Sequence, residues 1–424
     1  MSLPAWNLLC DLYAIPRTLL GEGFEKSLAR IRQDVPVEVL RLASGTACGS
    51  WTVPPEWQLK RATLVAPSGE VLADGLQNPC AIWQYSTPFT GILSREQLRP
   101  HLAASAHTPD GVPQLVTYYT RRWGFSLSAR QMQSLPPGDY RVDIQAEFVP
   151  GHLSIGTAFL PGRSKQTILI DSVLSASALA NNLSGVAAGV ALFQALSVQR
   201  DRKYSYRWLF TPETLGPIAL AYHFPQVFQD AVGGLNLQNL ADPGEAFYYK
   251  RSRPGNSVFD RSMEHALKHS GLAHEIAEYD VRTGECGNEK AYNSLGIEAP
   301  VGAFRRTQLG RYPEYDTSLD DLGFVSQTKL SQSVSLIEAA LQVLENNRVL
   351  KNTFKGEPFL SGYGLFPKIE RDADRLPYDY LMGFADGSQD LIGLAERARL
   401  PMERFVEPAR LMEEKGLLRE VEPG

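Results

Sequence analysis

The sequence predicts an α/β fold with a mixed, mostly parallel sheet flanked by helices. Between about residues 137 and 350, strand-like runs alternate with helical segments, and this order joins parallel strands through helices that cover both faces of a sheet. A β-rich stretch precedes this region and a short helical module follows it. The expected strands are 139–146, 166–171, 206–210, 234–240 and 299–305, and the expected helices are 183–198, 258–268 and 328–346.

The first 136 residues show two different sequence patterns. Residues 1–42 have apolar residues at helical spacing, whereas residues 43–136 consist of short alternating runs and turns. We therefore expect residues 43–136 to be an inserted β-rich domain, and residues 1–42 and 137–350 to form one α/β domain. The aromatic residues that we expect in a small core of the insert are Trp51, Trp57, Trp83 and Tyr85.

Residues 368–424 are predicted to form three short helices and a strand, the outline of a winged helix. Winged helices commonly bind DNA, but acids outnumber bases after residue 376, and phosphate contacts need the opposite balance. The expected recognition helix carries Glu403, Glu407, Glu413 and Glu414. We therefore expect a packing module or a dimerisation module, the second of which would give a homodimer, rather than a module that binds DNA.

Composition excludes several classes of protein. The 424 residues are 43% hydrophobic and 21% charged, and a formal net charge of −5 gives no general attraction to nucleic acid or an anionic membrane. Residues 1–17 lack the pattern of a signal peptide, and the longest apolar run, 186–196, is too short to span a bilayer. The four cysteines form no CxxC pair. We expect a cytoplasmic protein with reduced thiols and no membrane partner.

Three polar segments follow strands of the expected sheet, where ligands bind in open α/β folds. The segments are 172–182, 211–214 and 312–321. Each has an ordinary structural explanation, because Asn182 suits a helix N-cap, Glu213 suits a first helical turn and Asp316 suits a loop or cap. A carboxylate at Glu213, between a strand and Gly216, is equally well explained as a functional group.

Several stretches along the chain carry long and unusual motifs. They are Ser44-Gly-Thr, residues 51–57, Tyr-Tyr-Thr-Arg-Arg-Trp-Gly-Phe at 118–125, Asn-Asn-Leu-Ser-Gly at 181–185, Thr-Pro-Glu-Thr at 211–214 and residues 312–320. In their order and spacing these stretches resemble a bacterial aminopeptidase-like family. The resemblance implies a zinc-aminopeptidase-type catalytic domain, an inserted β-rich domain and a C-terminal winged helix, over nearly the whole chain.

The resemblance also implies that two metal positions of the family carry other residues here. The family's first ligand, a His in a Cys-His-Pro-Ser segment, falls on Ser175 or Ala176, because a one-residue gap leaves two alignments. The bridging acid that active relatives place in the next turn falls on Asn181 or Asn182.

The other family positions differ in part. The Asp of the family's Asp-Glu-Arg motif corresponds to Asn288, followed by Glu289, and the His of its Tyr-His-Thr-Ser motif corresponds to Asp316, preceded by Tyr315. The acid of its Pro-Glu-Thr motif, a general base or ligand in such enzymes, remains as Glu213.

Zinc is held in proteins by imidazole, thiolate or carboxylate, so Ser, Ala and Asn are poor ligands. His265 and His269 have the i, i+4 spacing of a metal-binding pair, but no acidic pattern accompanies them, and two surface histidines on an amphipathic helix are commoner. Glu213 and Asp316 with amide oxygens would form only a weak cage for a hard cation. We therefore expect no metal and no cofactor.

These replacements imply an amino-acyl-shaped pocket with one candidate base. Loss of a zinc-activated water, with Glu213 kept, favours metal-independent transfer of an aminoacyl or acyl group in a biosynthetic pathway. The donor is expected to be a peptide, a thioester or an aminoacyl-tRNA. The expected substrate contacts are Ser175, Asn181, Asn182, Asn288, Glu289, Arg306, Tyr315 and Asp316.

The sequence leaves a tRNA partner and two alternative functions open. The basic residues Arg121, Arg122, 250–253, Arg305 and Arg306 suit a tRNA, but surface or internal salt bridges explain them better. A non-catalytic pseudoenzyme that binds an amino acid or peptide fits the same replacements. An active metallo-aminopeptidase with atypical ligands is the third alternative.

Overall fold

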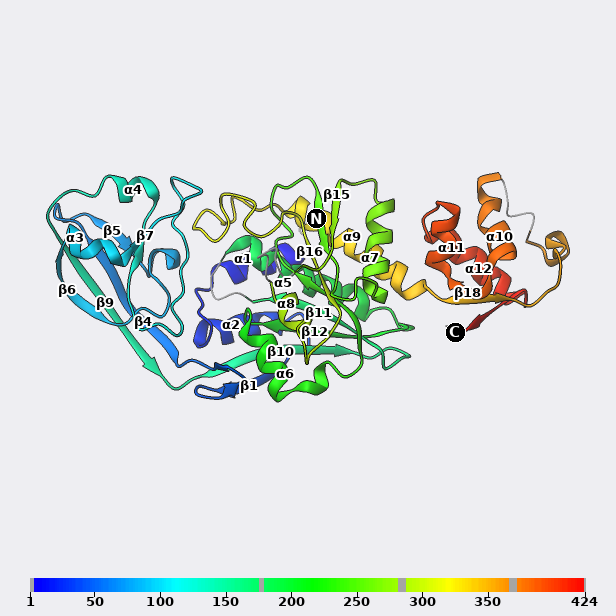
Figure 1. Ribbon diagram of the computed structural model, residues 1–424, viewed down its shortest axis with the longest axis horizontal. Coiled ribbons are helices and arrows are strands. Elements are labelled where there is room, and N and C mark those ends of the chain that lie inside the picture. The colour runs from blue at the N-terminus through cyan, green and yellow to red at the C-terminus, as the bar shows by residue number, and fades with distance from the viewer. Residues whose placement is uncertain (1–3, 175–178, 281–286, 366–371, 423–424) are drawn as a thin grey trace. The chain divides into compact units, whose positions relative to one another are not determined.

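The computed structural model describes residues 4–174, 179–280, 287–365 and 372–422. The chain divides into two compact units, Met1–Gly255 with Glu275–Val334, and Asn256–His274 with Ser335–Gly424. Figure 1 shows the large sheet and the inserted strands of the first unit and the helical module of the second. Among the described residues, no helix combines the length and the apolar character needed to cross a bilayer.

An eight-stranded sheet forms the centre of the first unit, in the order β1-β10-β12-β11-β13-β16-β14-β15. The central strands β12, β11, β13 and β16 are parallel, whereas β1, β10 and β14 pair antiparallel with their neighbours. This confirms the predicted mixed, mostly parallel sheet. The strands are β1 (Glu38–Ala43), β10 (His152–Leu160), β11 (Thr167–Val173), β12 (Ser205–Thr211), β13 (Ala231–Leu237), β14 (Phe247–Lys250), β15 (His274–Ala277) and β16 (Val301–Arg305).

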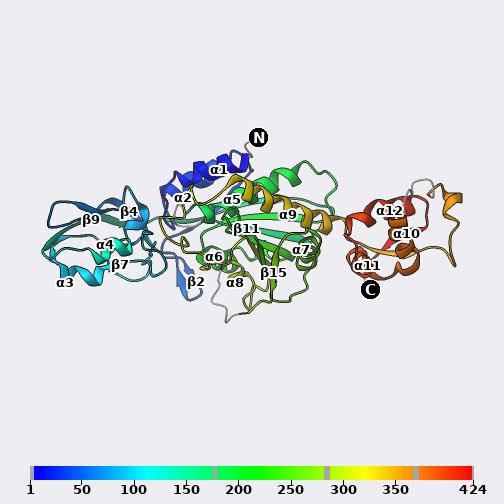
Figure 2. The same cartoon turned by 90° about the horizontal axis from the view of Figure 1, so that it is seen from above.

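Helices cover both faces of this sheet. All residues of β11 are buried, as expected for a strand whose apolar run packs on two sides. Figure 2 shows α1 and α5 on one face and α6 and α8 on the other. The helices of this unit include α1 (Pro4–Tyr13), α2 (Glu22–Ile31), α5 (Ala180–Ser197), α6 (Leu215–His223) and α8 (Glu289–Tyr292), and α9 (Gln327–Asn346) leads into the second unit.

The N-terminus of α5 is tied to the loop that follows β16. Leu179, at the N-cap position, makes no side-chain cap. Instead the backbone N–H of Ala180 donates to the carbonyl of Asp320 (3.0 Å), and the N–H of Asn181 donates to the Asp320 carboxylate (2.7 Å). A distant acid thus satisfies the first N–H groups of the helix.

The inserted strands form a separate four-stranded sheet, β5-β4-β9-β6. Its longest strand, β9, was expected in the large sheet, but it pairs along its length with β4 and β6. Apolar residues at alternate positions of β9, among them Tyr140, Val142 and Ile144, are buried in the core of the insert. The strands are β4 (Glu56–Val65), β5 (Val71–Asp74), β6 (Phe89–Ser94) and β9 (Asp139–Val149).

Shorter elements complete the insert. They are the strands β2 (Ala47–Cys48), β3 (Trp51–Thr52), β7 (Leu102–Ala103) and β8 (Phe125–Ser126), the helices α3 (Arg95–Leu98) and α4 (Ala129–Gln133), and 3-10 turns at Pro79–Ala81 and Arg99–His101. A further 3-10 turn, Pro225–Val227, follows α6 in the α/β part.

The second unit contains the predicted winged helix. Its three-stranded antiparallel sheet has the order β18-β17-β19. Within α12, Arg410 pairs with Glu407 (2.6 Å) and with Glu414, so its charge is largely neutralised by the same helix. The elements are α7 (Val258–His269), β17 (Val349–Asn352), a 3-10 turn at Leu360–Tyr363, α10 (Asp372–Phe384), β18 (Asp386–Asp390), α11 (Leu391–Ala398), α12 (Glu403–Glu414) and β19 (Leu418–Val421).

A close approach of α5 to β13 predicts a stability effect. A Cβ atom on Gly185 would lie 2.1 Å from the carbonyl oxygen of Leu237, which is backbone and cannot rotate away. We expect Gly185→Ala to lower the free energy of unfolding by about 1–3 kcal/mol or more, measured by denaturant titration. Gly383→Ala in α10, where no atom lies within 4 Å, is the control and should be neutral or stabilising. Equal effects of the two substitutions would contradict the close packing.

Candidate functional site

Segments that follow three strands of the large sheet line one pocket of about 320 Å³. The start of α5, the turn after β12 and the loop after β16 each contribute, because the carboxyl ends of parallel strands lie at one edge of a sheet. Three of the candidate residues, Asn182, Glu213 and Asp316, are brought together there. The lining residues are Leu19, Trp51, Gln114, Val116, Tyr118, Tyr119, Asn182, Glu213, Thr214, Leu215 and Asp316.

Glu213 lies in a tight turn between β12 and α6. The next residue, Thr214, has φ 60° and ψ −60°, a backbone conformation that is rare for a β-branched side chain. Such a residue costs about 1–3 kcal/mol and persists only where its surroundings hold it. The turn therefore presents Glu213 to the pocket at the expense of local strain.

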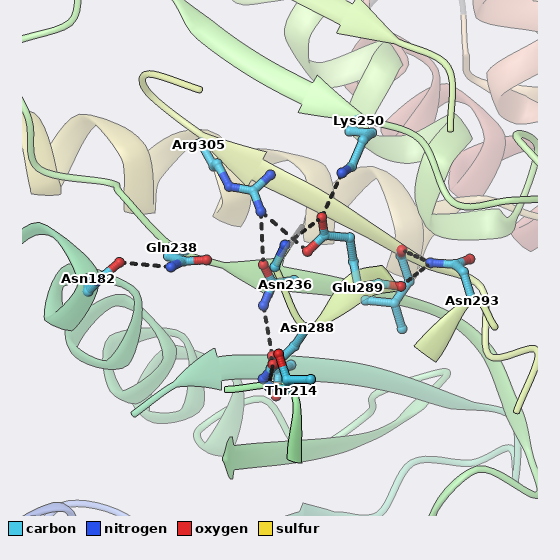
Figure 3. A network of polar contacts seen from close by, with 12 residues as sticks. Asn182, Thr214, Asn236, Gln238, Lys250, Asn288, Glu289, Asn293 and Arg305 are labelled. Carbon is cyan, nitrogen blue, oxygen red and sulfur yellow. Dashed lines mark hydrogen bonds and ion pairs between the residues drawn. The ribbon is translucent and has the colours of Figure 1, made fainter. Parts of the chain in front are cut away.

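Asn288 holds this turn through hydrogen bonds of its side chain (Figure 3). Its side-chain carbonyl accepts a hydrogen bond from the backbone N–H of Thr214 (2.8 Å). Its side-chain N–H₂ group donates to the hydroxyl of Thr211 (2.7 Å) and to the carboxylate of Asp171 (3.1 Å). Asn288 was expected to contact substrate, but it is 1% exposed and does not line the pocket.

Asp171 is the centre of the polar network beneath the pocket. This fully buried carboxylate accepts four hydrogen bonds, from Tyr292 (2.7 Å), Thr211 (2.8 Å), Asn236 (2.7 Å) and Asn288 (3.1 Å). Burial raises the pKa of Asp171 to about 6, although the four donors favour the ionised form. These hydrogen bonds join the ends of β11, β12 and β13 to α8.

Glu289 is buried among cations rather than directed at the pocket (Figure 3). It pairs with Lys250 (2.7 Å) and with Arg305 (3.3 Å), and its side chain has no exposed surface. Burial opposes ionisation, but the two cations outweigh it and hold the pKa of Glu289 below its ordinary value. Glu289 is therefore a structural ion-pair partner, not the substrate contact that we expected.

The pKa of Glu213 is raised although solvent reaches its side chain in the pocket. The pocket walls remove part of its hydration, and the carboxylates of Asp316 and Glu289 add repulsion that Arg305 offsets only partly. Together these effects raise the pKa of Glu213 to about 7. The pocket therefore holds a carboxyl group that exchanges a proton near neutral pH.

Asp316 reaches the pocket from a loop that the insert holds in place. Its φ is 51°, and its carbonyl accepts the backbone N–H of Gln114 (2.8 Å). Next to it, Pro113 and Thr317 form an isolated antiparallel β-bridge. Burial raises the pKa of Asp316 to about 6, against a hydrogen bond from Tyr315 that favours the ionised form. Tyr315, an expected substrate contact, thus touches the pocket carboxylate without lining the pocket itself.

Two neighbouring asparagines take opposite roles at the start of α5. Asn181 is fully buried and donates to Asp242 (3.2 Å) and to the hydroxyl of Tyr312 (3.2 Å). Asn182 lines the pocket, and its side-chain carbonyl accepts a hydrogen bond from Gln238 (2.7 Å). Asn182 therefore faces the pocket, whereas Asn181 belongs to the buried framework.

The other expected contacts lie elsewhere. Ser175 is outside the described residues. Arg306 is 4% exposed and donates to the backbone carbonyl of Gly244 (2.7 Å), away from the pocket. Arg305 and Lys250 are also buried, so internal ion pairs and hydrogen bonds account for these three cations, the explanation that was preferred over a tRNA contact.

Residues of the insert form the outer wall of the pocket, a role that was not predicted for them. Trp51 was expected in the small core of the insert, but it is 38% exposed and packs edge-to-face on Tyr119 at 5.9 Å. Tyr119 and Val116 are exposed as well, and all three line the pocket. The unusual Tyr118-Tyr119 motif was the available signal, because exposed aromatic residues often mark binding surfaces.

The histidine pair in the second unit also differs from expectation. His265 is 3% exposed, so it is not a surface residue, and Glu396 accompanies the pair. Among the described residues, His265, His269 and Glu396 are the one group of three potential metal ligands. Met402 donates its backbone N–H to Nε2 of His265 (2.9 Å), which leaves the proton on Nδ1, where it donates to Glu396 (2.6 Å). That arrangement leaves His265 no free lone pair for a metal.

Comparison with known proteins gives the family. A family model described as a domain of unknown function (DUF4910) matches residues 6–347, and a winged helix-turn-helix model matches residues 348–420. A Clostridium acetobutylicum protein named for polysaccharide biosynthesis and an aminopeptidase-like domain is 31% identical over 407 residues, 94% of this chain and 92% of that protein. The chain belongs to this aminopeptidase-like family.

Solved structures agree with the family's fold. A Clostridium acetobutylicum protein described as a peptidase matches with a TM-score of 0.91 and 30% identity, over 98% of this chain and 96% of that chain. A zinc aminopeptidase from Bacillus subtilis matches with a TM-score of 0.57 and 13% identity, over 80% of this chain and 93% of that chain, a likeness of fold alone. The predicted aminopeptidase-like fold with a winged helix is confirmed.

The described residues of this family member do not fit a zinc pair. Co-catalytic zinc ions need several imidazole or carboxylate ligands with a bridging acid. The described pocket lining contains Glu213 and Asp316, but no histidine or cysteine. Asp171 directs its oxygens at four donors, and Glu289 is neutralised by two cations, so neither is free to bind metal.

The raised pKa of Glu213 predicts a pH-dependent stability. The folded chain keeps the Glu213 proton up to about pH 7, whereas the unfolded chain releases it near the ordinary value of 4.5. Between these values the folded state binds more protons, so the Glu213 contribution to stability falls as pH rises. We expect Glu213→Gln to raise Tm relative to the parent at about pH 8, and the gain to vanish near pH 4.5.

Calorimetry at both pH values measures this difference. Glu70→Gln, at an exposed position of the insert, is the control and should change neither Tm. A gain for Glu213→Gln that is equal at both pH values would show that the Glu213 carboxyl does not titrate as described.

Proposed function

We propose that this chain catalyses metal-independent transfer of an aminoacyl or acyl group at the pocket of Glu213. The observation that carries the proposal is that a carboxyl poised near neutral pH and a fixed amide face the same small pocket, in an aminopeptidase-like fold. A general base and a carbonyl-polarising donor are the two groups that acyl transfer needs.

Glu213 is the proposed base. A group with a pKa of about 7 is partly ionised at neutral pH, so it accepts a proton from a nucleophile and returns it later. In the proposed reaction, Glu213 removes the proton of an acceptor amine or hydroxyl as that group bonds to the acyl carbon. The bond to the leaving group then breaks, and Glu213 returns the proton to it. Atoms and charge balance without a further reactant.

Asn182 is the proposed donor to the developing oxyanion. Gln238 donates to the side-chain carbonyl of Asn182, and Asn182 lines the pocket, so its amide N–H₂ group is the donor that we assign to the ligand. A preorganised N–H donor stabilises the negative charge that develops on the acyl oxygen. In this proposal it takes the part that a metal ion plays in a zinc aminopeptidase.

The charge of the pocket supports a substrate with a free amino group. Asp316 and Glu213 line the pocket, and no lysine, arginine or histidine does so among the described residues. An ammonium group gains attraction from these carboxylates, whereas a phosphate or a free carboxylate meets repulsion. This favours a thioester, ester or peptide of an amino acid as the donor, over a donor whose phosphates enter the pocket.

The surroundings of the pocket bear on the donor and the pathway. Of the cations considered for tRNA, only Arg121, Arg122, Arg251 and Arg253 are not buried, which weakens the case for aminoacyl-tRNA. The Clostridium acetobutylicum relative is named for polysaccharide biosynthesis, which supports a biosynthetic role. We further propose the domain limits 1–42 with 137–350, 43–136 and 368–424, except that β9 (Asp139–Val149), which pairs with β4 and β6, extends the insert beyond residue 136.

A transfer assay tests the proposal. We expect the protein to convert aminoacyl methyl esters and thioesters to hydroxamates when hydroxylamine is the acceptor. Mass spectrometry measures the hydroxamate that forms. Glu213→Gln should lower kcat by about 10²- to 10⁴-fold, the usual contribution of a general base. Asp316→Asn should mainly raise KM for donors with a free amino group.

The exposed Glu70→Gln is the matched control for this assay and should retain full activity. Binding of the same esters without any transfer would favour the non-catalytic alternative. Transfer that survives in Glu213→Gln would remove Glu213 from the mechanism.

Metal content supplies an independent test. Because the described residues do not fit a zinc pair, we expect elemental analysis of protein purified without chelators to find far less than one zinc ion per chain. Close to two zinc ions per chain, the co-catalytic stoichiometry, would support an active metallo-aminopeptidase instead.

A further inference from the structure

The Asn288 side chain links the buried network to the backbone beside Glu213. Its carbonyl accepts the N–H of Thr214, and its N–H₂ group donates to Thr211 and Asp171, as Figure 3 shows in part. Asn288 is buried and does not line the pocket, so it cannot touch a ligand there. The most direct link from Asn288 to the pocket is its hydrogen bond with the backbone of Thr214, the residue after Glu213.

Thr214 needs such support. A side chain branched at Cβ rarely adopts a φ of 60°, and this residue directly follows the proposed base. The turn also has one short hydrogen bond within the backbone, from the N–H of Leu215 to the carbonyl of Glu213 (2.6 Å). If Thr214 relaxed to an ordinary conformation, the direction of the preceding side chain would change with it.

We propose that Asn288 is the positioning residue for Glu213: by holding the N–H of Thr214 it keeps the strained turn in place and the Glu213 side chain in the pocket. This inference rests on the proposed function only for its effect on turnover. The structural part, the control of the turn, stands on the hydrogen bonds alone.

The chemistry of the three contacts explains why an amide occupies this position. Thr211 donates its hydroxyl proton to Asp171 and can therefore only accept from Asn288. The carboxylate of Asp171 also requires a donor, whereas the N–H of Thr214 requires an acceptor. One Asn side chain supplies two donors and an acceptor at once. An ionised Asp would face Asp171 with a like charge and without a donor.

Hydrogen exchange at Thr214 tests the structural part without any substrate. We expect Asn288→Ala to speed exchange of the Thr214 amide by roughly tenfold, the effect of losing one hydrogen bond. The measurement is mass spectrometry of the peptide that covers the turn. Asn288→Asp keeps an acceptor oxygen and should restore slow exchange, although it lowers stability.

Asn236→Ala is the matched control. Asn236 is equally buried and also donates to Asp171 (2.7 Å), but none of its hydrogen bonds reaches Thr214. We expect this variant to lose stability while the Thr214 amide stays protected. Equal acceleration in Asn288→Ala and Asn236→Ala would show general loosening of the network and would overturn the proposal, as would unchanged exchange in Asn288→Ala.

Kinetics with leucine methyl ester and hydroxylamine test the effect on Glu213. Asn288→Ala should lower kcat at least tenfold with little change in KM, since the base moves but the ligand contacts remain. Asn288→Asp should recover a large part of kcat. If exchange behaves as expected and kcat does not fall, the positioning of Glu213 is refuted. If the parent itself shows no transfer, the proposed function fails, and the exchange experiment still decides the role of Asn288.

Discussion

The buried carboxylate of Asp171 is the constraint on which the site depends. A carboxylate without contact to water is tolerated only when hydrogen bonds replace its hydration, and here Tyr292, Thr211, Asn236 and Asn288 do so. These donors come from β12 and β13, the two strands that flank β11, and from the segment around α8. Satisfying one carboxylate thus fixes the relative positions of the chain segments beneath the pocket, and partial satisfaction would be costly.

Much of the fold could be predicted from the sequence, since apolar runs such as β11 and the alternation of strands and helices are local patterns. The pairing of β9 could not, because residues 139–146 look like any half-buried strand, and only long-range contacts with β4 and β6 assign it to the insert. Trp51 was misplaced for a similar reason. Aromatic residues suit a core and a binding surface equally, and the partner that separates the two cases, Tyr119, is distant in sequence.

The candidate site was predictable by position but not by role. Topology places Asn182, Glu213 and Asp316 at one edge of the sheet, and the structure brings them to one pocket. Whether a polar residue there faces a ligand or the core depends on partners such as Gln238, Lys250 and Arg305, which no local motif reveals. Asn288 and Glu289 therefore looked like ligand contacts in the sequence, although their hydrogen bonds and ion pairs belong to the framework.

The β-bridge between Pro113 and Thr317 joins the insert to the α/β domain beside the pocket, and both parts contribute lining residues. The inner wall comes from the strand ends, which the buried network holds rigid, whereas the outer wall comes from residues such as Val116 and Tyr119. Evolution can therefore alter the size and surface of the outer wall through an exposed segment while the framework stays unchanged. A change of ligand would then need substitutions in the exposed segment of the insert, whereas stable folding depends on the buried network of the α/β domain.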